Sequence, residues 1–241
     1  MRRDWTAVMP VKRLGVAKSR LRGAVPAARH SDLALAMVRD TATAVLAARA
    51  VAELLVVTDD PVTAAAVTAL GARVVPDRPA AGLPPDRPAA GLPPDRPAAG
   101  LNAAMRYGAD EVAGTGRHRF VLAGDLPALR AEQLDAALAG AEAPAEAPAE
   151  AGRSFVADAA GSGTVLLAVA PGGPLDPHFG VGSAAAHAAS GAHPLDGDWP
   201  GLRQDVDTPA DLLTVLGLGA GPHTCALLRD VGLKVACVSA A

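Results

Sequence analysis

The sequence predicts an α/β fold: a three-layer α/β/α sandwich around a mostly parallel, twisted sheet, with a small antiparallel extension. One observation is that short apolar runs alternate with segments of helical periodicity up to Gly140, because strands joined through helices pair in parallel by right-handed crossovers. A second is a pair of apolar runs around a Gly-rich turn in residues 154–171, which is typical of antiparallel strands. Since 50% of the 241 residues are hydrophobic, the chain can bury the core of one large domain.

The expected strands are short apolar runs that end in turn-forming or charged residues. In chain order they are residues 6–11, 53–60, 72–77, 119–125 and two strands within 154–171. The expected helices have apolar residues at helical spacing, and several carry end signals. They are residues 31–48 with Ser31 as N-cap, 61–71 between Pro61 and Gly71, 102–114, 126–140, a helix starting at Ser183, and 208–217 with Thr208 as cap and Pro209 in the first position.

Two tracts of low complexity interrupt this order. The unit PDRPAAGL occurs three times between Pro76 and Asn102, and its prolines exclude a helix and remove donors from any sheet. We interpret the first two copies as a tandem insertion, because only the third copy ends in Asn102. The predicted organisation is a single domain over residues 1–224, with a repeat insertion at 76–93 and an Ala/Glu/Pro connector at 141–151, followed by a C-terminal tail over 225–241.

Composition excludes several functional classes. A net charge of -3 and 2% aromatic residues give neither a basic surface nor stacking platforms for nucleic acid. No apolar run reaches the roughly 18 residues that span a bilayer, and the N-terminal segment MRRDWTAVMPV lacks the features of a signal peptide. We therefore expect a cytoplasmic protein that binds neither nucleic acid nor membranes.

Charged residues gather where parallel strands are expected to end, which is where open α/β sheets place their ligands. They are Lys12 and Lys18 after the first strand, Asp125 after the fourth, and Asp205 with Asp207 before the last helix. Carboxylates hold magnesium, the metal binds phosphates, and lysines neutralise the charge of a leaving group. The pattern predicts a metal-dependent reaction on a nucleoside triphosphate.

Seven motifs occur in an order that resembles one known family. They are PVKRLGVAKSRL, VTDD, AGLNAAM, GDLP, GSGT, HFGVGS and DVDTPADL. The chain is similar from Trp5 to His223 to the 2-phospholactate or phosphoenolpyruvate guanylyltransferases, which make an activated intermediate of the deazaflavin coenzyme F-420. GDLP and DVDTPADL are shared more widely with sugar-nucleotide and molybdenum-cofactor nucleotidyltransferases. The segment from GSGT to HFGVGS is what distinguishes this family from those other nucleotidyltransferases.

The resemblance implies a fold like that of the nucleotide-diphospho-sugar transferases, with GTP and a phosphorylated three-carbon acid as substrates and Mg²⁺ as cofactor. It implies metal binding by Asp125, Asp205 and Asp207, and phosphate binding by Lys12 and Lys18. It implies nucleotide binding by Pro10, Val11, Gly100, Leu101 and Asn102, and acceptor binding by Thr164, Gly180 and Ser183. Backbone N–H groups at the helix start after Gly182 are expected to add an anion site.

Several alternatives stay open on the sequence. The acceptor can be phosphoenolpyruvate or 2-phospholactate, the metal site can hold one ion or two, and a homodimer or contact with the next transferase of the pathway is conceivable. A metal-dependent glycosyltransferase would use the DVD triplet for a nucleotide-sugar, and a non-catalytic scaffold could carry the proline-rich repeats as a binding module.

Simple structural roles compete with some of these site assignments. Asp205 and Asp207 could cap the last helix, and Ser183 could be a plain N-cap. The histidines show no metal spacing and are interpreted as surface or structural residues: His30, His118, His178, His187, His193 and His223.

Overall fold

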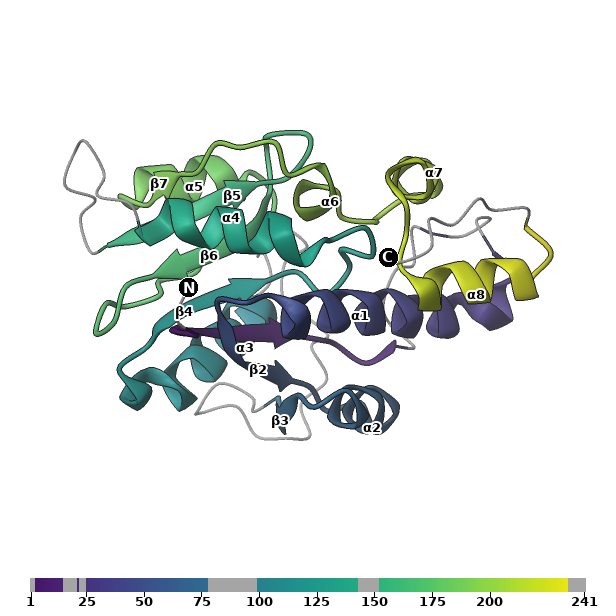
Figure 1. Ribbon diagram of the computed structural model, residues 1–241, viewed down its shortest axis with the longest axis horizontal. Coiled ribbons are helices and arrows are strands. Elements are labelled where there is room, and N and C mark those ends of the chain that lie inside the picture. The colour runs from purple at the N-terminus through teal and green to yellow at the C-terminus, as the bar shows by residue number, and fades with distance from the viewer. Residues whose placement is uncertain (1–2, 15–20, 22–24, 78–98, 143–151, 234–241) are drawn as a thin grey trace, which may run out of the picture.

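A seven-stranded mixed sheet forms the centre of the computed structural model, in the order β3-β2-β1-β4-β6-β5-β7 (Figure 1). The structure describes residues 3–14, 21, 25–77, 99–142 and 152–233. The strands are β1 (Trp5–Pro10), β2 (Val51–Val57), β3 (Arg73–Val75), β4 (His118–Leu122), β5 (Arg153–Ala157), β6 (Thr164–Val169) and β7 (His193–Pro194). β3, β2, β1 and β4 are parallel neighbours, while β6 runs antiparallel to both β4 and β5. The predicted mostly parallel sheet with an antiparallel extension is confirmed.

The helices of the described residues are α1 (His30–Ala47), α2 (Pro61–Ala69), α3 (Ala99–Glu111), α4 (Ala131–Glu142), α5 (Ser183–Ala189), α6 (Pro200–Arg203), α7 (Pro209–Leu218) and α8 (Pro222–Asp230). Short 3₁₀ turns occupy Ala27–Arg29 and Ala113–Thr115. Within these described segments, no helix combines the length and the apolarity needed to cross a membrane.

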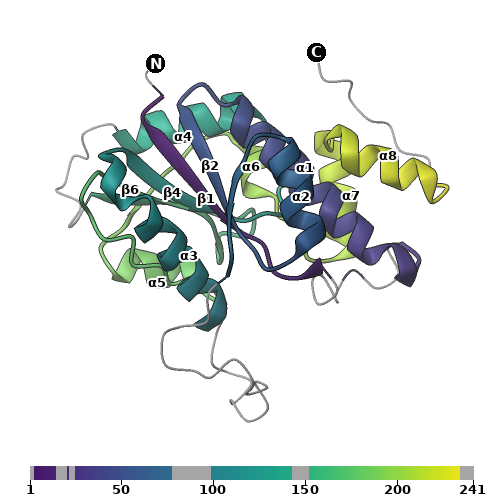
Figure 2. The same ribbon diagram turned by 90° about the horizontal axis from the view of Figure 1, so that it is seen from below.

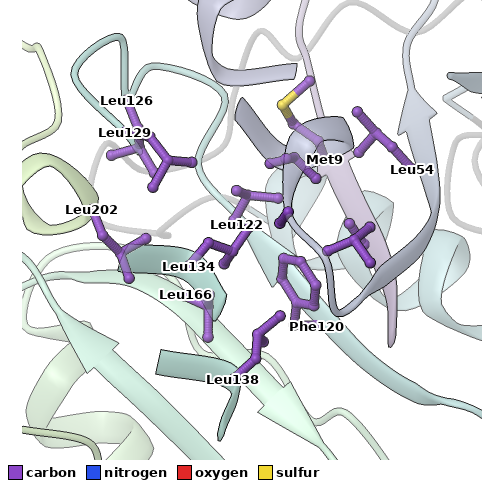
Figure 3. Close-up of a cluster of buried hydrophobic side chains, with 14 of the residues drawn as sticks. Met9, Leu54, Phe120, Leu122, Leu126, Leu129, Leu134, Leu138, Leu166 and Leu202 are labelled. Carbon is purple, nitrogen blue, oxygen red and sulfur yellow. The ribbon is translucent and has the colours of Figure 1, made fainter. Parts of the chain in front are cut away.

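Helices cover both faces of the sheet, which gives the three predicted layers. α1 and α4 pack on one face, and α3 and α5 pack on the other (Figures 1 and 2). Side chains of β1 alternate between the two cores: Ala7 and Met9 join the first, and Val8 joins the second. Met9, Phe120 and Leu122 meet the leucines of α4 in the first core (Figure 3).

The close approach of α3 to the sheet depends on Gly108. A Cβ atom there would lie 2.6 Å from Cγ1 of Val8 and 2.7 Å from Cγ2 of Val57. These distances are shorter than any ordinary carbon contact, so a larger side chain would push α3 off β1 and β2. α3 is thereby held against the strands whose ends carry the candidate site.

The chain beyond residue 224 was predicted to be a tail, and its first part is not. α8 runs from Pro222 to Asp230 and packs on α1, with Leu228 fully buried. The carboxylate of Asp40 in α1 accepts the N–H groups of His223 and Thr224 at 2.9 and 2.8 Å, which caps the start of α8. Residues 234–241 lie outside the described residues.

Two predicted helix starts are wrong by a few residues. α1 begins at His30 without a side-chain cap, because the 3₁₀ turn Ala27–Arg29 leads directly into it, so Ser31 is not its N-cap. α4 begins at Ala131, and the segment before it forms tight turns in which the N–H of Leu126 donates to Oγ1 of Thr41 at 3.0 Å.

One described end of each low-complexity tract belongs to a helix. Ala141 and Glu142 belong to α4, and Oε1 of Glu142 accepts a hydrogen bond from Nε1 of Trp5 at 2.6 Å. Residues 143–151 and 78–98, which hold the rest of the connector and nearly all of the repeat insertion, lie outside the described residues. The third repeat copy ends inside α3, so Gly100, Leu101 and Asn102 form its first turn.

Candidate active site

A cavity of about 450 Å³ opens beside the carboxyl ends of β1 and β4. Its walls come from the strand ends, from α3, from the turn before β6, from the loop before α5 and from the segment before α7. The lining residues are Pro10, Leu101, Met105, Ala123, Gly124, Asp125, Asp158, Ser162, Gly163, Thr164, Phe179, Gly180, Val181, Gly182, Ser183, Asp205 and Asp207. Eight of the thirteen predicted site residues are among them: Pro10, Leu101, Asp125, Thr164, Gly180, Ser183, Asp205 and Asp207.

One wall of the cavity brings together carboxylates from two distant segments. The N–H of Val206 donates to the carbonyl of Asp125 at 3.2 Å, so the segment before α7 lies against the turn after β4. Val206 is fully buried, while Asp205 and Asp207 both line the cavity. The cap of α7 is a capping box of Thr208 and Asp211, so capping does not account for these two acids.

The cavity is strongly acidic. With Asp158, four carboxylates line it, and no lysine or arginine does so among the residues that the structure describes. An anionic ligand in this cavity would need cations to offset the charge of these carboxylates. Hard carboxylate oxygens suit Mg²⁺, which typically takes one or two protein carboxylates and completes its shell with water and substrate phosphates. In the described part of the chain, no three His, Cys, Asp or Glu side chains are arranged so that they could hold a metal ion together.

Asp158 shapes the turn that leads into β6, and sequence reasoning missed it. Its Oδ1 accepts the N–H of Ser162 and its Oδ2 accepts the N–H of Gly163, both at 2.9 Å. A Cβ atom at Gly163 would lie 2.4 Å from Oδ2 of Asp158, so a larger residue there would displace the carboxylate that holds the turn. An acid just before a Gly-Ser-Gly run is the signal that could have indicated this turn. The turn sets Thr164 at the edge of the cavity.

The three predicted acceptor residues, Thr164, Gly180 and Ser183, also line the cavity. Thr164 is 9% exposed and Ser183 is 2% exposed, so both are largely buried where they line the cavity. Gly180 has φ 140° and Gly182 has φ 70°, values that favour glycine. The first N–H groups of α5 were expected to bind an anion, and this expectation is wrong for two of them. Ser183 N donates to Gly180 O and Ala184 N to Ser162 O, both at 3.1 Å.

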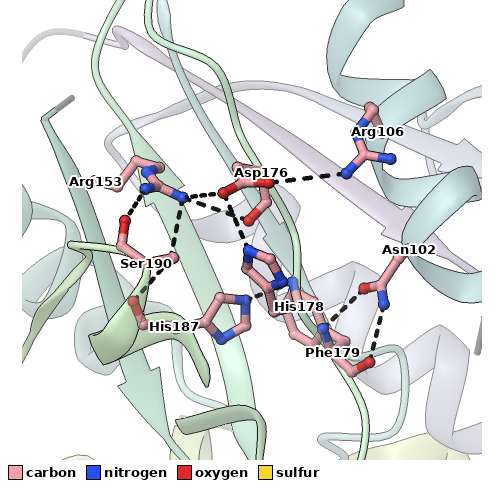
Figure 4. Close-up of polar contacts among 8 residues, drawn as sticks. All are labelled: Asn102, Arg106, Arg153, Asp176, His178, Phe179, His187 and Ser190. Atoms are coloured by element: carbon pink, nitrogen blue, oxygen red, sulfur yellow. Dashed lines mark hydrogen bonds and ion pairs between the residues drawn. The ribbon is translucent and has the colours of Figure 1, made fainter. Parts of the chain in front are cut away.

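Asn102 was predicted to contact the nucleotide, but its amide holds a protein loop. Its Nδ2 donates to the carbonyl of Phe179 at 3.0 Å, and its Oδ1 accepts the N–H of Phe179 at 2.8 Å (Figure 4). The amide therefore pairs with Phe179 as one strand residue pairs with another. Its neighbour Leu101 lines the cavity, whereas Gly100 and Asn102 do not.

Of the two predicted phosphate-binding lysines, the structure describes Lys12 but not Lys18. Lys12 is exposed, and a Cβ atom at Gly100 would lie 2.7 Å from its Nζ, so the ammonium lies at the first turn of α3. It does not line the cavity, and neither does the buried Val11, whose N–H donates to Val57 O at 2.9 Å. Lys18 lies outside the described residues.

Asp60 anchors the loop that carries Lys12. Its Oδ2 accepts the N–H of Leu14 at 3.1 Å, and its Oδ1 caps α2 by accepting the N–H of Thr63 at 2.9 Å. Burial of Asp60 favours the protonated acid, but the N–H groups of Thr63 and Leu14 outweigh it and lower the pKa of the carboxyl below 3.8. The anchor is therefore ionised at neutral pH.

Replacing Asp60 by alanine should lower the free energy of unfolding by about 1–2 kcal/mol at neutral pH, because a helix cap and a loop anchor are lost together. Because the pKa is lower in the folded state, this stability is present above 3.8, the ordinary value, and is lost as the pH falls through the lower value of the folded protein. Urea unfolding of the wild-type protein and of the Asp60→Ala variant, at pH steps from 7 downward, measures this difference in the free energy of unfolding. Asp196, 99% exposed, is the matched alanine control. A difference that stays constant into the acid range would contradict this role.

Comparisons with known proteins agree on one kind of relative. The chain is 53% identical to a phosphoenolpyruvate guanylyltransferase of Salinispora arenicola, over 94% of both chains. It is 50% identical to one of Geodermatophilus obscurus, again over 94% of both, and 42% identical to one of Mycobacterium marinum over 92% of both. No protein-family model matches the chain.

Solved structures show the same fold at low sequence identity. A protein of Desulfovibrio desulfuricans described as a nucleotide-diphospho-sugar transferase matches with a TM-score of 0.65 and 17% identity over 95% of both chains. A nucleotidyl transferase of Methanothermobacter matches with a TM-score of 0.56 and 19% identity, over 94% of this chain and 98% of that one. The predicted fold class is thereby confirmed.

Proposed function

Since this chain belongs to the phosphoenolpyruvate guanylyltransferase family, we propose that it transfers GMP from GTP to the phosphate of phosphoenolpyruvate and releases pyrophosphate. The observation that carries the proposal is that one cavity joins the two halves of the expected site. Asp125, Asp205 and Asp207 line it, and so do Thr164, Gly180 and Ser183. A nucleotide bound at the carboxylates and a small phosphorylated acid bound at the second set of residues would therefore share one cavity.

The reaction needs no protein nucleophile. An oxygen of the acceptor phosphate attacks the α-phosphorus of GTP, and a new P–O bond forms there. The bond from the α-phosphorus to the oxygen bridging to the β-phosphate breaks, and its electron pair leaves with pyrophosphate. Because the attacking phosphate is already anionic, no general base has to remove a proton, and catalysis consists of alignment and charge neutralisation.

The acidic wall would hold the cofactor. We assign Asp125, Asp205 and Asp207 as the carboxylates that hold Mg²⁺, since they are hard oxygen ligands in a cavity that needs cations. A bound magnesium ion supplies neutralisation of phosphate charge and a template for the triphosphate. Lys12 at the first turn of α3, together with Lys18, is assigned to the phosphates that leave.

Thr164, Gly180 and Ser183 would hold the acceptor. Thr164 and Ser183 offer hydroxyl groups. Gly180 has no side chain, so its backbone can come close to the ligand. The names of the relatives favour phosphoenolpyruvate over 2-phospholactate, and a guanylylated product of this kind suits a role in making coenzyme F-420. A homodimer and contact with the next transferase of the pathway stay predictions.

The test is incubation of the purified protein with GTP, Mg²⁺ and either phosphoenolpyruvate or 2-phospholactate, with mass detection of the product and a parallel measurement of pyrophosphate. We expect the guanylylated acid from phosphoenolpyruvate and stoichiometric pyrophosphate, with both signals lost when EDTA removes the metal. Hydrolysis of a nucleotide-sugar without any guanylylated acid would instead favour the glycosyltransferase alternative and overturn the proposal.

A further inference from the structure

His187 lies in α5, next to Thr164 of the candidate acceptor residues, and is fully buried. Both of its ring nitrogens have partners on different segments. The N–H of His178 donates to Nε2 of His187 at 2.9 Å, and Nδ1 lies 2.9 Å from Oγ1 of Thr164 (Figure 4 shows the first contact). The imidazole therefore bridges the loop before α5 and the first residue of β6.

The first contact determines the direction of the second. A backbone N–H can only donate, so Nε2 of His187 must be the acceptor. A neutral imidazole carries one hydrogen, which is then on Nδ1, so Nδ1–H donates to Oγ1 of Thr164. The hydroxyl of Thr164 cannot donate to this histidine, and its own hydrogen is available to another acceptor.

The surroundings of His187 keep it neutral. Burial lowers the pKa of its imidazole to about 4, and the charges of His178 and Arg153 act in the same direction. The carboxylate of Asp176 and the backbone of Ser183 oppose this without reversing it. Near pH 7 the ring is thus one donor and one acceptor, as the two contacts require.

We propose that His187 is a positioning residue for the anionic acceptor, because it makes Thr164 a hydrogen-bond donor toward the cavity. The proposal rests on the proposed function and deepens its acceptor site. Phosphate and carboxylate groups carry only acceptor oxygens when ionised, so a hydroxyl can bind them only through its hydrogen. If Thr164 donated to the histidine, its lone pairs would face the anion and repel it.

The same ring sets the loop that carries the other acceptor residues. His187 holds the N–H of His178, and Asn102 holds both backbone groups of the next residue, Phe179 (Figure 4). The ring of Phe179 packs edge-on against His187 with centroids 5.0 Å apart. Gly180 and Ser183 follow directly, so their placement depends on these anchors.

The tautomer can be measured without any turnover. Long-range proton–nitrogen NMR of the wild-type protein with ¹⁵N-labelled histidine separates protonated from unprotonated ring nitrogens. We expect one histidine with Nδ1 protonated and Nε2 unprotonated at pH 7, assigned to His187 by its loss in the His187→Gln variant. An Nε2–H tautomer or an imidazolium at pH 7 would overturn the inference, whether or not the protein is a guanylyltransferase.

Paired variants test the effect on the acceptor. His187→Asn keeps a donor near the position of Nδ1, and His187→Gln keeps an acceptor near Nε2 but no donor to Thr164. We expect His187→Gln to raise KM for phosphoenolpyruvate about 10- to 100-fold, the loss of one hydrogen bond to a charged group, while His187→Asn raises it less and KM for GTP stays unchanged in both. Combining His187→Gln with Thr164→Val should add little to Thr164→Val alone.

Two results would contradict the positioning role. Either KM for phosphoenolpyruvate is unchanged in His187→Gln, or KM for both substrates rises together with a fall in melting temperature, which is what a purely structural histidine would produce. If the wild-type protein makes no product from GTP and any acid, the proposed function fails, and the NMR measurement still decides the tautomer.

Discussion

Asp125→Asn should lower kcat about 100- to 1,000-fold, because it removes one of the negative charges that we assign to binding magnesium and the triphosphate. The fold should not change. The contact that joins this residue to the segment of Asp205 and Asp207 is between backbone atoms, from Val206 N to Asp125 O at 3.2 Å, and it is independent of the side chain. Steady-state turnover of GTP with phosphoenolpyruvate, together with a thermal melt, measures both parts of the prediction.

The control for this charge is Asp196→Asn, since Asp196 is 99% exposed and lies outside the cavity. Its loss of one negative charge matches that of Asp125→Asn, so a general effect of net charge would appear in both variants. We expect wild-type turnover for Asp196→Asn. Near-normal turnover in Asp125→Asn at saturating Mg²⁺ would show that the acidic wall has no part in the reaction.

Gly201→Ala should reduce both stability and activity. A Cβ atom at this position in α6 would lie 2.1 Å from the carbonyl oxygen of Ala128 and 2.8 Å from Oε1 of Gln133. The carbonyl is backbone and cannot move aside cheaply, so we expect a loss of about 1–3 kcal/mol in the free energy of unfolding, as for other overpacked sites. Because α6 leads into Asp205 and the Ala128 turn follows Asp125, the shift would also separate the carboxylates.

Gly217→Ala is the matched control, because Gly217 is also helical and no atom lies within 4 Å of the position of its Cβ. Alanine there should raise the free energy of unfolding by up to about 1 kcal/mol through its better helix propensity. Urea unfolding and turnover of the two variants would show the contrast. Equal effects of the two substitutions would mean that the contact with Ala128 is not the reason why position 201 needs glycine.

Much of the fold could be predicted because its signals are local. Alternation of apolar runs with helical periodicity gave β1, β2, β3 and β4, and the cap and proline at Thr208 and Pro209 gave α7. The segment of α8 was assigned to a tail from residue 225 on, because the carboxylate that caps the helix is that of Asp40, whose bonds to His223 and Thr224 span 183 and 184 residues. No local pattern around residue 225 shows that a distant carboxylate caps the helix.

The site was predicted in part for the same reason. Residues placed by strand ends, such as Asp125 and Thr164, line the cavity as expected. Asp158 was missed because its role is to hold the turn before Thr164, and Asn102 was assigned to the nucleotide although its amide binds Phe179, 77 residues away. A motif identifies which residue types occur together, but not which partner each polar atom finds.

The sequence by itself determined the α/β architecture, the family and most residue types of the cavity, since periodicity and motif order are properties of the chain. Only the tertiary structure decided what the polar atoms of the site do. It bonds the N–H groups of Ser183 and Ala184 to protein carbonyls, and it places His187 against Thr164, 23 residues away in the chain. The physical reason is that hydrogen-bond direction depends on every neighbour of an atom in space, and folding alone brings those neighbours together.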